Sequence, residues 1–201
     1  MIDQNKVGAI ISCLQAGGVI ALPTETIYGL CCDPRNTRAL EKLFEIKQRD
    51  PSKPVLCVTG HLQQIEQLVE MPFSIQKITK NYWPGPLTII FPLRAKTTLA
   101  PQVISETKKI ALRLSPDPLI KAITQSFRFP ITATSSNISG MPFLLSAADI
   151  QTQFGGQLDL IIETDHKLPQ IPSTLIEYDT EKGITLIREG AIPWKEIEQL
   201  I

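Results

Sequence analysis

The stretch GGVIALPTETIYGLCCD, residues 17–33, joins an apolar segment directly to a polar one. The apolar run at 19–22 predicts a buried strand, which Pro23 ends. The polar tripeptide Thr-Glu-Thr follows at 24–26, where α/β proteins commonly bind ligands. The alternative is a turn whose hydroxyl groups bond their own backbone, and the tripeptide alone favours that turn.

Helical and strand-like patterns alternate on both sides of this stretch. The later strands have little helix between them, which favours a mixed sheet over a purely parallel one. We therefore expect one α/β domain over residues 1–201, with a twisted open mixed sheet, flanking helices and no second domain. The patterns predict helices at 5–16, from Asn36 to before Pro51, at 61–69, 73–81, 116–127 (starting after Ser115), 146–154 and from Pro193, and strands at 19–22, 55–59, 87–93, 109–114, 131–133, 158–162, 174–178 and 184–188.

The composition is that of a globular protein without net charge. The chain is 43% hydrophobic and 20% charged, with 20 Lys and Arg against 20 Asp and Glu. This balance argues against a general nucleic-acid coat protein, although it leaves room for a local basic pocket. We see no signal peptide and no apolar run long enough to span a membrane, so a cytoplasmic protein is expected. The expected reduced, mostly buried thiols are Cys13, Cys31, Cys32 and Cys57.

Several common catalytic motifs are missing from the sequence. It contains no G-x-S-x-G, no G-x-x-x-x-G-K-[ST] and no G-x-G-x-x-G after the first strand. The two histidines, His61 and His166, are isolated, and no histidine-rich cluster suggests a metal site. We therefore expect neither a covalent nucleophile nor metal-ligating residues.

Two segments remain as candidates for binding an anion. Lys47, Arg49 and Lys53 lie within seven residues and could hold a polyphosphate. From spacing alone, the favoured interpretation is a solvated helix end. The polar loop TSSNISG at 134–140 follows a short strand, and its hydroxyl and amide groups suit a phosphate, ribose or base. A turn bonded to its own backbone is the alternative there too.

The ordered set of motifs resembles one family. PTETIYGL, K-Q-R with a following Lys-Pro, WPGPLT, ALRLS, TSSNISG, PST and LIREGAI occur in that order over about residues 8–193. This set is similar to the YrdC-like threonylcarbamoyl-AMP synthases of the bacterial TsaC type. The resemblance implies a twisted open sheet with a concave basic cleft. It also implies a nucleotidyltransferase that makes threonylcarbamoyl-AMP and pyrophosphate from L-threonine, bicarbonate and ATP, for the t6A modification of adenosine 37 in tRNA.

The resemblance also assigns roles to individual residues. Two departures from the family concern Lys53, where many relatives have Asn, and Val58, where many have His. A third is the segment MPFLLSA, which is more apolar than the small polar run that is usual in the family. The implied catalytic residues are Lys47, Arg49, Ser135 and Asn137; the implied ATP-binding residues are these four with Lys53 and Arg188; and the implied threonine-binding residues are Thr26, Arg113 and Ser173.

The family further suggests partners for the reaction. Mg²⁺ is expected with the triphosphate, held by phosphate oxygens. Transfer proteins of the TsaB, TsaD and TsaE type are expected to use the product, whereas direct tRNA contact and oligomeric state are left open. The alternative function is a non-catalytic RNA-binding or ribosome-maturation factor that uses the same basic cleft.

Overall fold

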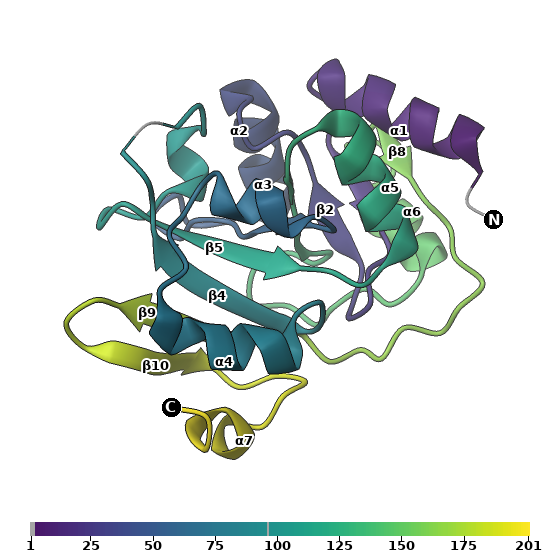
Figure 1. The fold of residues 1–201 in the computed structure, drawn as a ribbon. Helices are drawn as coiled ribbons and strands as arrows, with labels where there is room; N and C mark the ends of the chain where they lie inside the picture. The colour runs from purple at the N-terminus through teal and green to yellow at the C-terminus, as the bar shows by residue number, and fades with distance from the viewer. Residues whose placement is uncertain (1–2, 96) are drawn as a thin grey trace.

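The computed structural model describes residues 3–95 and 97–201, which form an α/β fold with two mixed sheets (Figure 1). The four-stranded sheet has the order β7-β2-β1-β8, and the six-stranded sheet has the order β10-β9-β4-β5-β3-β6. The strands are β1 Ile20–Leu22, β2 Gly29–Cys31, β3 Cys57–Thr59, β4 Leu87–Pro92, β5 Lys109–Leu114, β6 Ile131–Thr132, β7 Thr134–Ser135, β8 Leu160–Ile161, β9 Thr174–Asp179 and β10 Gly183–Arg188. The helices are α1 Gln4–Gln15, α2 Thr37–Lys47, α3 Leu62–Glu66, α4 Phe73–Tyr82, α5 Pro118–Phe127, α6 Ala147–Phe154 and α7 Trp194–Glu198, with a 3-10 turn at Pro101–Val103.

Both sheets contain parallel and antiparallel pairs. β1 is antiparallel to β2 and parallel to β8, while β5 is parallel to β3 and antiparallel to β4. The predicted α/β class with mixed strands is thus confirmed, although the strands divide into two sheets where one was expected. β2 and β7 were not predicted, because strands of three and two residues give too short a pattern to recognise.

At one point the chain passes directly from one sheet to the other. β6 belongs to the six-stranded sheet and β7 to the four-stranded sheet, with only Ala133 between them. The Ala133 N–H donates to the Leu56 carbonyl at 3.0 Å, and the Ser136 N–H donates to the Tyr28 carbonyl at 3.0 Å. The polar loop after β7 is therefore fixed where the two sheets meet.

The helix ends are set by local chemistry. Asn36 caps α2 as predicted, since its side chain accepts the Ala39 N–H at 3.1 Å. α5 begins at Pro118 rather than soon after Ser115, because the Asp117 carboxylate accepts two N–H groups of the first turn. α1 and α5 lie side by side (Figure 1).

Two apolar clusters form the core. The larger contains residues of α2 and α4 together with residues of both sheets, and the smaller lies under α1 and α5. Cys31, Cys32 and Cys57 are fully buried free thiols, and Cys13 is partly buried. Burial raises the pKa of Cys32 to about 12, so this thiol stays protonated and unreactive. Within residues 3–95 and 97–201, no helix is both long and apolar enough to span a bilayer.

Candidate active site

A cleft of about 240 Å³ opens between the residues that follow β1, the face of the six-stranded sheet and the start of β9. Ile90, Ala111 and Leu175 contribute apolar surface from three neighbouring strands. Among the described residues that line the cleft, none is Asp or Glu. Its hydroxyl groups belong to Thr24, Thr26, Tyr28, Ser105, Thr134, Ser135 and Ser173, and its cations are Arg49, Lys109, Arg113 and Arg188.

A second pocket adjoins this cleft. Arg49, Ser135 and Phe143 line both, so they form a shared wall. The cations at the end of α2 therefore meet the polar loop, as the family resemblance implies. The second pocket is lined in addition by Lys47, Asp50, Lys53, Asn137, Ser139, Gly140 and Met141.

Lys47 is enclosed by the polar loop. Its side chain is almost fully buried, and Nζ donates to the Ser135 carbonyl, to the Asn137 carbonyl at 2.8 Å and to Asn137 Oδ1 at 3.3 Å. Burial, reinforced by the nearby charge of Arg49, lowers the pKa of Lys47 to about 7. Three acceptors match the three N–H groups of an ammonium ion. Direct phosphate contact by Lys47 would therefore require one of these bonds to break.

The Arg49 guanidinium is bound to backbone carbonyls at two of its nitrogens, and Arg49 also lines the cleft. Its Nε donates to the Lys53 carbonyl at 2.7 Å, and one Nη donates to the Pro54 carbonyl at 2.9 Å. The guanidinium carbon lies 6.0 Å from the centre of the Phe44 ring. Because two of its nitrogens are fixed by backbone carbonyls, the guanidinium has a defined orientation at the shared wall.

The polar loop uses many of its own groups internally. Ser135 Oγ donates to Asn137 Oδ1 at 2.6 Å, and Asn137 Nδ2 donates to the Met141 carbonyl at 2.5 Å. The Ser139 N–H donates to the Lys47 carbonyl at 2.8 Å. The loop is therefore both a turn bonded to its own backbone and a candidate ligand site. Its internal hydrogen bonds fix the positions of Ser135 and Asn137, which line the pockets.

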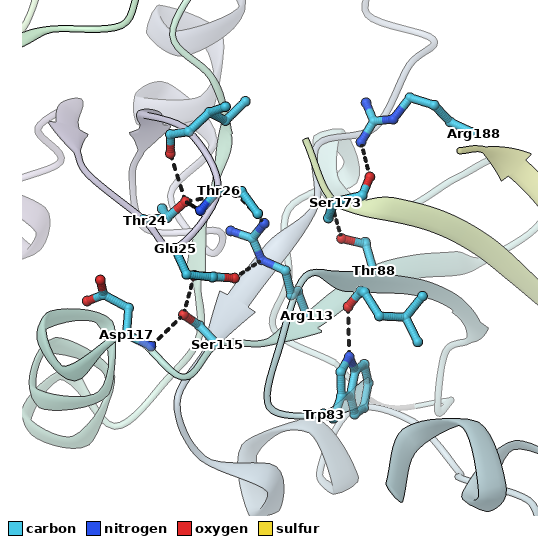
Figure 2. A network of polar contacts seen from close by, with 12 residues as sticks. Thr24, Glu25, Thr26, Trp83, Thr88, Arg113, Ser115, Asp117, Ser173 and Arg188 are labelled. Atoms are coloured by element: carbon cyan, nitrogen blue, oxygen red, sulfur yellow. Dashed lines mark hydrogen bonds and ion pairs between the residues drawn. The ribbon is translucent and has the colours of Figure 1, made fainter. Parts of the chain in front are cut away.

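The Thr-Glu-Thr segment combines both interpretations of its sequence (Figure 2). Thr24 makes a turn, because its hydroxyl donates to the Ile27 carbonyl at 2.7 Å and accepts the Thr26 N–H at 3.2 Å. The Thr26 hydroxyl accepts from Arg113 Nη1 at 3.0 Å. Thr26 and Arg113, both predicted to bind threonine, are therefore in direct contact.

The opposite wall is built from the start of β9 and the end of β10. Ser173 Oγ and Thr88 Oγ1 are 2.7 Å apart, and an Arg188 Nη donates to the Ser173 carbonyl at 2.8 Å. Burial lowers the pKa of Arg188, and the charge of Arg113 adds to this effect. Two guanidinium groups thus repel each other across a cleft without a lining carboxylate, which favours an anionic ligand.

The structure places every sequence-predicted residue at one of the two pockets. Lys47, Lys53 and Asn137 line the second pocket only, and Arg49 and Ser135 line both. The residues that line only the cleft are Thr26, Arg113, Ser173 and Arg188.

Several residues at the site were given no role from the sequence. Glu25 lies behind Arg113, Lys109 lines the cleft, and Phe143 belongs to the shared wall. In the sequence, Glu25 could have been recognised as a site residue by its position between Thr24 and Thr26. Phe143 could have been recognised because it belongs to the unusually apolar segment MPFLLSA. Val58 is fully buried in the smaller core cluster and is not part of the cleft lining.

Comparison with known proteins identifies similar chains. The Sua5/YciO/YrdC family model, described as "Telomere recombination", matches residues 12–190. A Photobacterium profundum protein named threonylcarbamoyl-AMP synthase is 33% identical over 185 residues, covering 90% of this chain and 97% of its own length. A Pyrococcus abyssi protein of the same name is 32% identical over the whole chain, which spans 58% of that protein.

Solved structures agree with these matches. The crystal structure of P. abyssi Sua5 complexed with L-threonine superposes with a TM-score of 0.91 at 30% identity, again over the whole chain and 58% of Sua5. Escherichia coli YciO has a TM-score of 0.86 at 22% identity, with 97% of this chain and 94% of YciO covered. This second likeness shows the fold alone.

Proposed function

Because the chain belongs to the Sua5/YciO/YrdC family, we propose that it is an L-threonylcarbamoyladenylate synthase. It joins L-threonine, bicarbonate and ATP into threonylcarbamoyl-AMP and releases pyrophosphate. The proposal is supported by the relatives with this name, one of which the chain covers almost completely. The observation that carries it in the structure is the pair of adjoining pockets with a shared wall, one of them lined by four cations and no carboxylate.

The two pockets divide the substrates between them. We assign the triphosphate to the side of Arg49, Lys53 and Asn137, where cations and amide groups suit phosphate oxygens. Threonine is assigned to the side of Thr26 and Arg113. The complex of P. abyssi Sua5 with L-threonine supports the presence of a threonine site in this fold.

The assigned groups fit chemistry that needs no enzyme nucleophile. The threonine amine and bicarbonate form a carbamate, one carbamate oxygen attacks the α-phosphorus of ATP, and pyrophosphate leaves. The protein positions the reactants and offsets negative charge along the phosphates. Arg49 and Ser135 serve this purpose by direct contact at the shared wall, and Arg188 adds positive charge from the opposite wall of the cleft. Lys47 serves it by holding the polar loop with Ser135 and Asn137.

The residues that the structure describes do not fit a dedicated metal cage. Within residues 3–95 and 97–201, no group of three or more His, Cys, Asp or Glu side chains gathers at one place. Asp50 is a single carboxylate at the second pocket. We therefore expect Mg²⁺ to be held by phosphate oxygens of the substrate.

An omission assay tests the proposed function. Purified protein is incubated with ATP, Mg²⁺, L-threonine and bicarbonate, and pyrophosphate is measured with each component left out in turn. Pyrophosphate release should require all three substrates, and mass spectrometry should detect threonylcarbamoyl-AMP. Release that continues without threonine, or no release in the complete mixture, would contradict the proposal.

The product is then a substrate for transfer to tRNA. We propose that TsaB-, TsaD- and TsaE-type proteins consume it in the cytoplasm, without assigning a direct tRNA contact to this chain. The alternative of a non-catalytic RNA-binding or ribosome-maturation factor predicts binding that weakens steeply with salt and no ATP turnover. No specific observation on the cleft favours that alternative.

A further inference from the structure

Glu25 is the carboxylate that pairs with Arg113, yet it is not part of the cleft lining. Its neighbours Thr24 and Thr26 line the cleft, as does Arg113, whereas Glu25 lies on the other side of the Arg113 guanidinium (Figure 2). The Glu25 side chain is only 13% exposed. A residue in this place can act on a ligand only through Arg113.

The Glu25 carboxylate is held by one hydrogen bond and one ion pair, and the Oε1–Nε contact of the ion pair does not have hydrogen-bond geometry. Oε1 lies 3.2 Å from Arg113 Nε, and Oε2 accepts the Ser115 hydroxyl at 2.6 Å. Ser115 is itself buried, its N–H donates to the Thr59 carbonyl at 2.8 Å, and its Oγ accepts the Asp117 N–H at 3.1 Å. The carboxylate is thus fixed to the end of β5 and the start of α5.

This anchor determines where the rest of Arg113 points. A guanidinium is a planar group with five N–H donors in a fixed arrangement, so restraining two nitrogens restrains the third. Nε faces Glu25 and Nη1 donates to Thr26. Among residues 3–95 and 97–201, no hydrogen-bond acceptor is found for Nη2, and Arg113 lines the cleft. The unused N–H groups of Nη2 are therefore available to a ligand.

We propose that Glu25 is a positioning residue that orients Arg113 toward the carboxylate of the amino-acid substrate, an inference that rests on the proposed synthase function. The neighbouring Arg188 repels Arg113, and Glu25 offsets that repulsion from the side away from the cleft. The ion pair keeps the guanidinium in one orientation before the substrate arrives, which reduces the ordering cost of binding.

The variant Glu25→Gln separates orientation from charge. Glutamine keeps the size of the side chain but removes the negative charge behind Arg113. Loss of that charge by itself would strengthen the attraction of Arg113 for a carboxylate and lower the KM for threonine. If Glu25 acts by orienting Arg113, the KM for threonine should instead rise about tenfold, as expected for one weakened charge-assisted contact, while the KM for ATP changes less than twofold.

A double-mutant cycle tests whether the effect passes through Arg113. In the Arg113→Lys background, Glu25→Gln should change the KM for threonine less than twofold, because the oriented group is already absent. Ser115→Ala removes the hydrogen bond to Glu25 Oε2 and should raise the KM for threonine by about threefold. If Glu25→Gln does not fold, Ser115→Ala replaces it as the test of the positioning role. Glu70→Gln removes an exposed ion pair with Arg94 elsewhere and is the matched control, expected to match the wild type.

The outcomes separate this inference from the proposed function. A threonine KM that falls or stays constant in Glu25→Gln would overturn the positioning role, as would equal rises in the two KM values or full additivity with Arg113→Lys. Wild-type protein that releases no threonine-dependent pyrophosphate would overturn the proposed function, and the inference with it. Melting temperatures within a few degrees of the wild type ensure that the kinetic changes do not reflect unfolding.

Discussion

Lys47 is an ammonium group surrounded by loop oxygens, and its burial makes it a pH-dependent element of stability. Its pKa is lowered from 10.5 to about 7 in the folded protein, chiefly by burial. Between these two values the unfolded chain binds more protons than the folded one, so stability rises with pH across this window. Below about pH 7 both states are protonated, and the full cost of burying the charge remains.

Lys47→Met removes this titration while keeping much of the side-chain length. The free energy of unfolding of the wild type, measured by urea denaturation from pH 6 to pH 10, should rise relative to that of Lys47→Met above pH 7. Pyrophosphate release by the variant should fall at least tenfold, because the loop with Ser135 and Asn137 loses its central donor. A stability difference that is constant over the pH range would contradict the lowered pKa.

Arg49 is expected to bind the triphosphate with two of its nitrogens already fixed. Arg49→Ala should raise the KM for ATP about tenfold or more, the effect of losing one charge-assisted hydrogen bond. Arg49→Lys should restore little, because a lysine cannot bond the Lys53 and Pro54 carbonyls and still reach the shared wall. Arg94→Lys, at an exposed ion pair, is the control, and an unchanged KM for ATP in Arg49→Ala would remove Arg49 from the phosphate site.

The sequence predicted which residues lie together at the two pockets better than it predicted how their side chains are bonded. The cations after α2 and the loop after β6 were predicted from an ordered set of motifs, and they do meet at one wall. The enclosure of Lys47 was not predictable, because its acceptors lie about 90 residues further along the chain. The link between Glu25 and Ser115 spans 90 residues for the same reason. Pairings this distant depend on tertiary packing, which local patterns do not contain.

At the scale of elements, one glycine keeps two segments of the cleft wall together. A Cβ atom on Gly190 would lie 2.3 Å from the Pro172 carbonyl oxygen and 2.6 Å from the Ser173 carbonyl carbon. Both are backbone atoms, so the strand start that carries Ser173 would have to move. The close approach is fixed by the Gly190 N–H, which donates to Thr174 Oγ1 at 3.0 Å. This contact gives the LIREGAI motif a structural role at the cleft.

Gly190→Ala should therefore damage both stability and substrate binding. Overpacking against backbone should cost about 1–3 kcal/mol of unfolding free energy, and displacement of Ser173 should raise the KM for threonine. Gly8→Ala is the matched control, since no atom lies within 4 Å of its added Cβ and α1 should gain up to about 1 kcal/mol. If Gly190→Ala melts like the wild type with an unchanged KM for threonine, the close approach has no functional consequence.

Elements with strong periodicity were predicted well, and short ones were not. Lys109–Leu114 was predicted with its observed bounds, and the Asn36 cap of α2 was correct. Thr134–Ser135 is a strand only because it pairs with β2, which lies far earlier in the chain, and Gly29–Cys31 is too short to be recognised although it pairs with both β1 and β7. The division into two sheets follows from the same residues, since the chain changes sheet within one residue at Ala133. No periodic pattern in a single sequence records such a change.

At the scale of the whole molecule, the cleft joins parts of both sheets, so ligand binding should stabilise the entire fold. Thr26 follows β1, Arg113 lies on β5 and Arg188 ends β10. A ligand that binds only the folded state stabilises it by RT ln(1 + [L]/Kd), which is about 2.7 kcal/mol at 100 times Kd. For a domain of this size, each 1 kcal/mol raises the melting temperature by roughly 2–4 °C.

ATP with Mg²⁺ at 100 times its Kd should therefore raise the melting temperature by roughly 5–10 °C, and L-threonine should add to this rise. Arg188→Ala should reduce both shifts, because its guanidinium belongs to the wall next to Arg113. Single-stranded RNA is the informative comparison: as a non-specific polyanion, it should stabilise the protein only at low salt. A rise in melting temperature with RNA that persists at physiological salt, together with no rise with ATP, would favour the RNA-binding alternative. The two ligands are distinguishable because a small nucleotide contacts only the cations of the cleft, whereas a long polyanion also binds charges outside it.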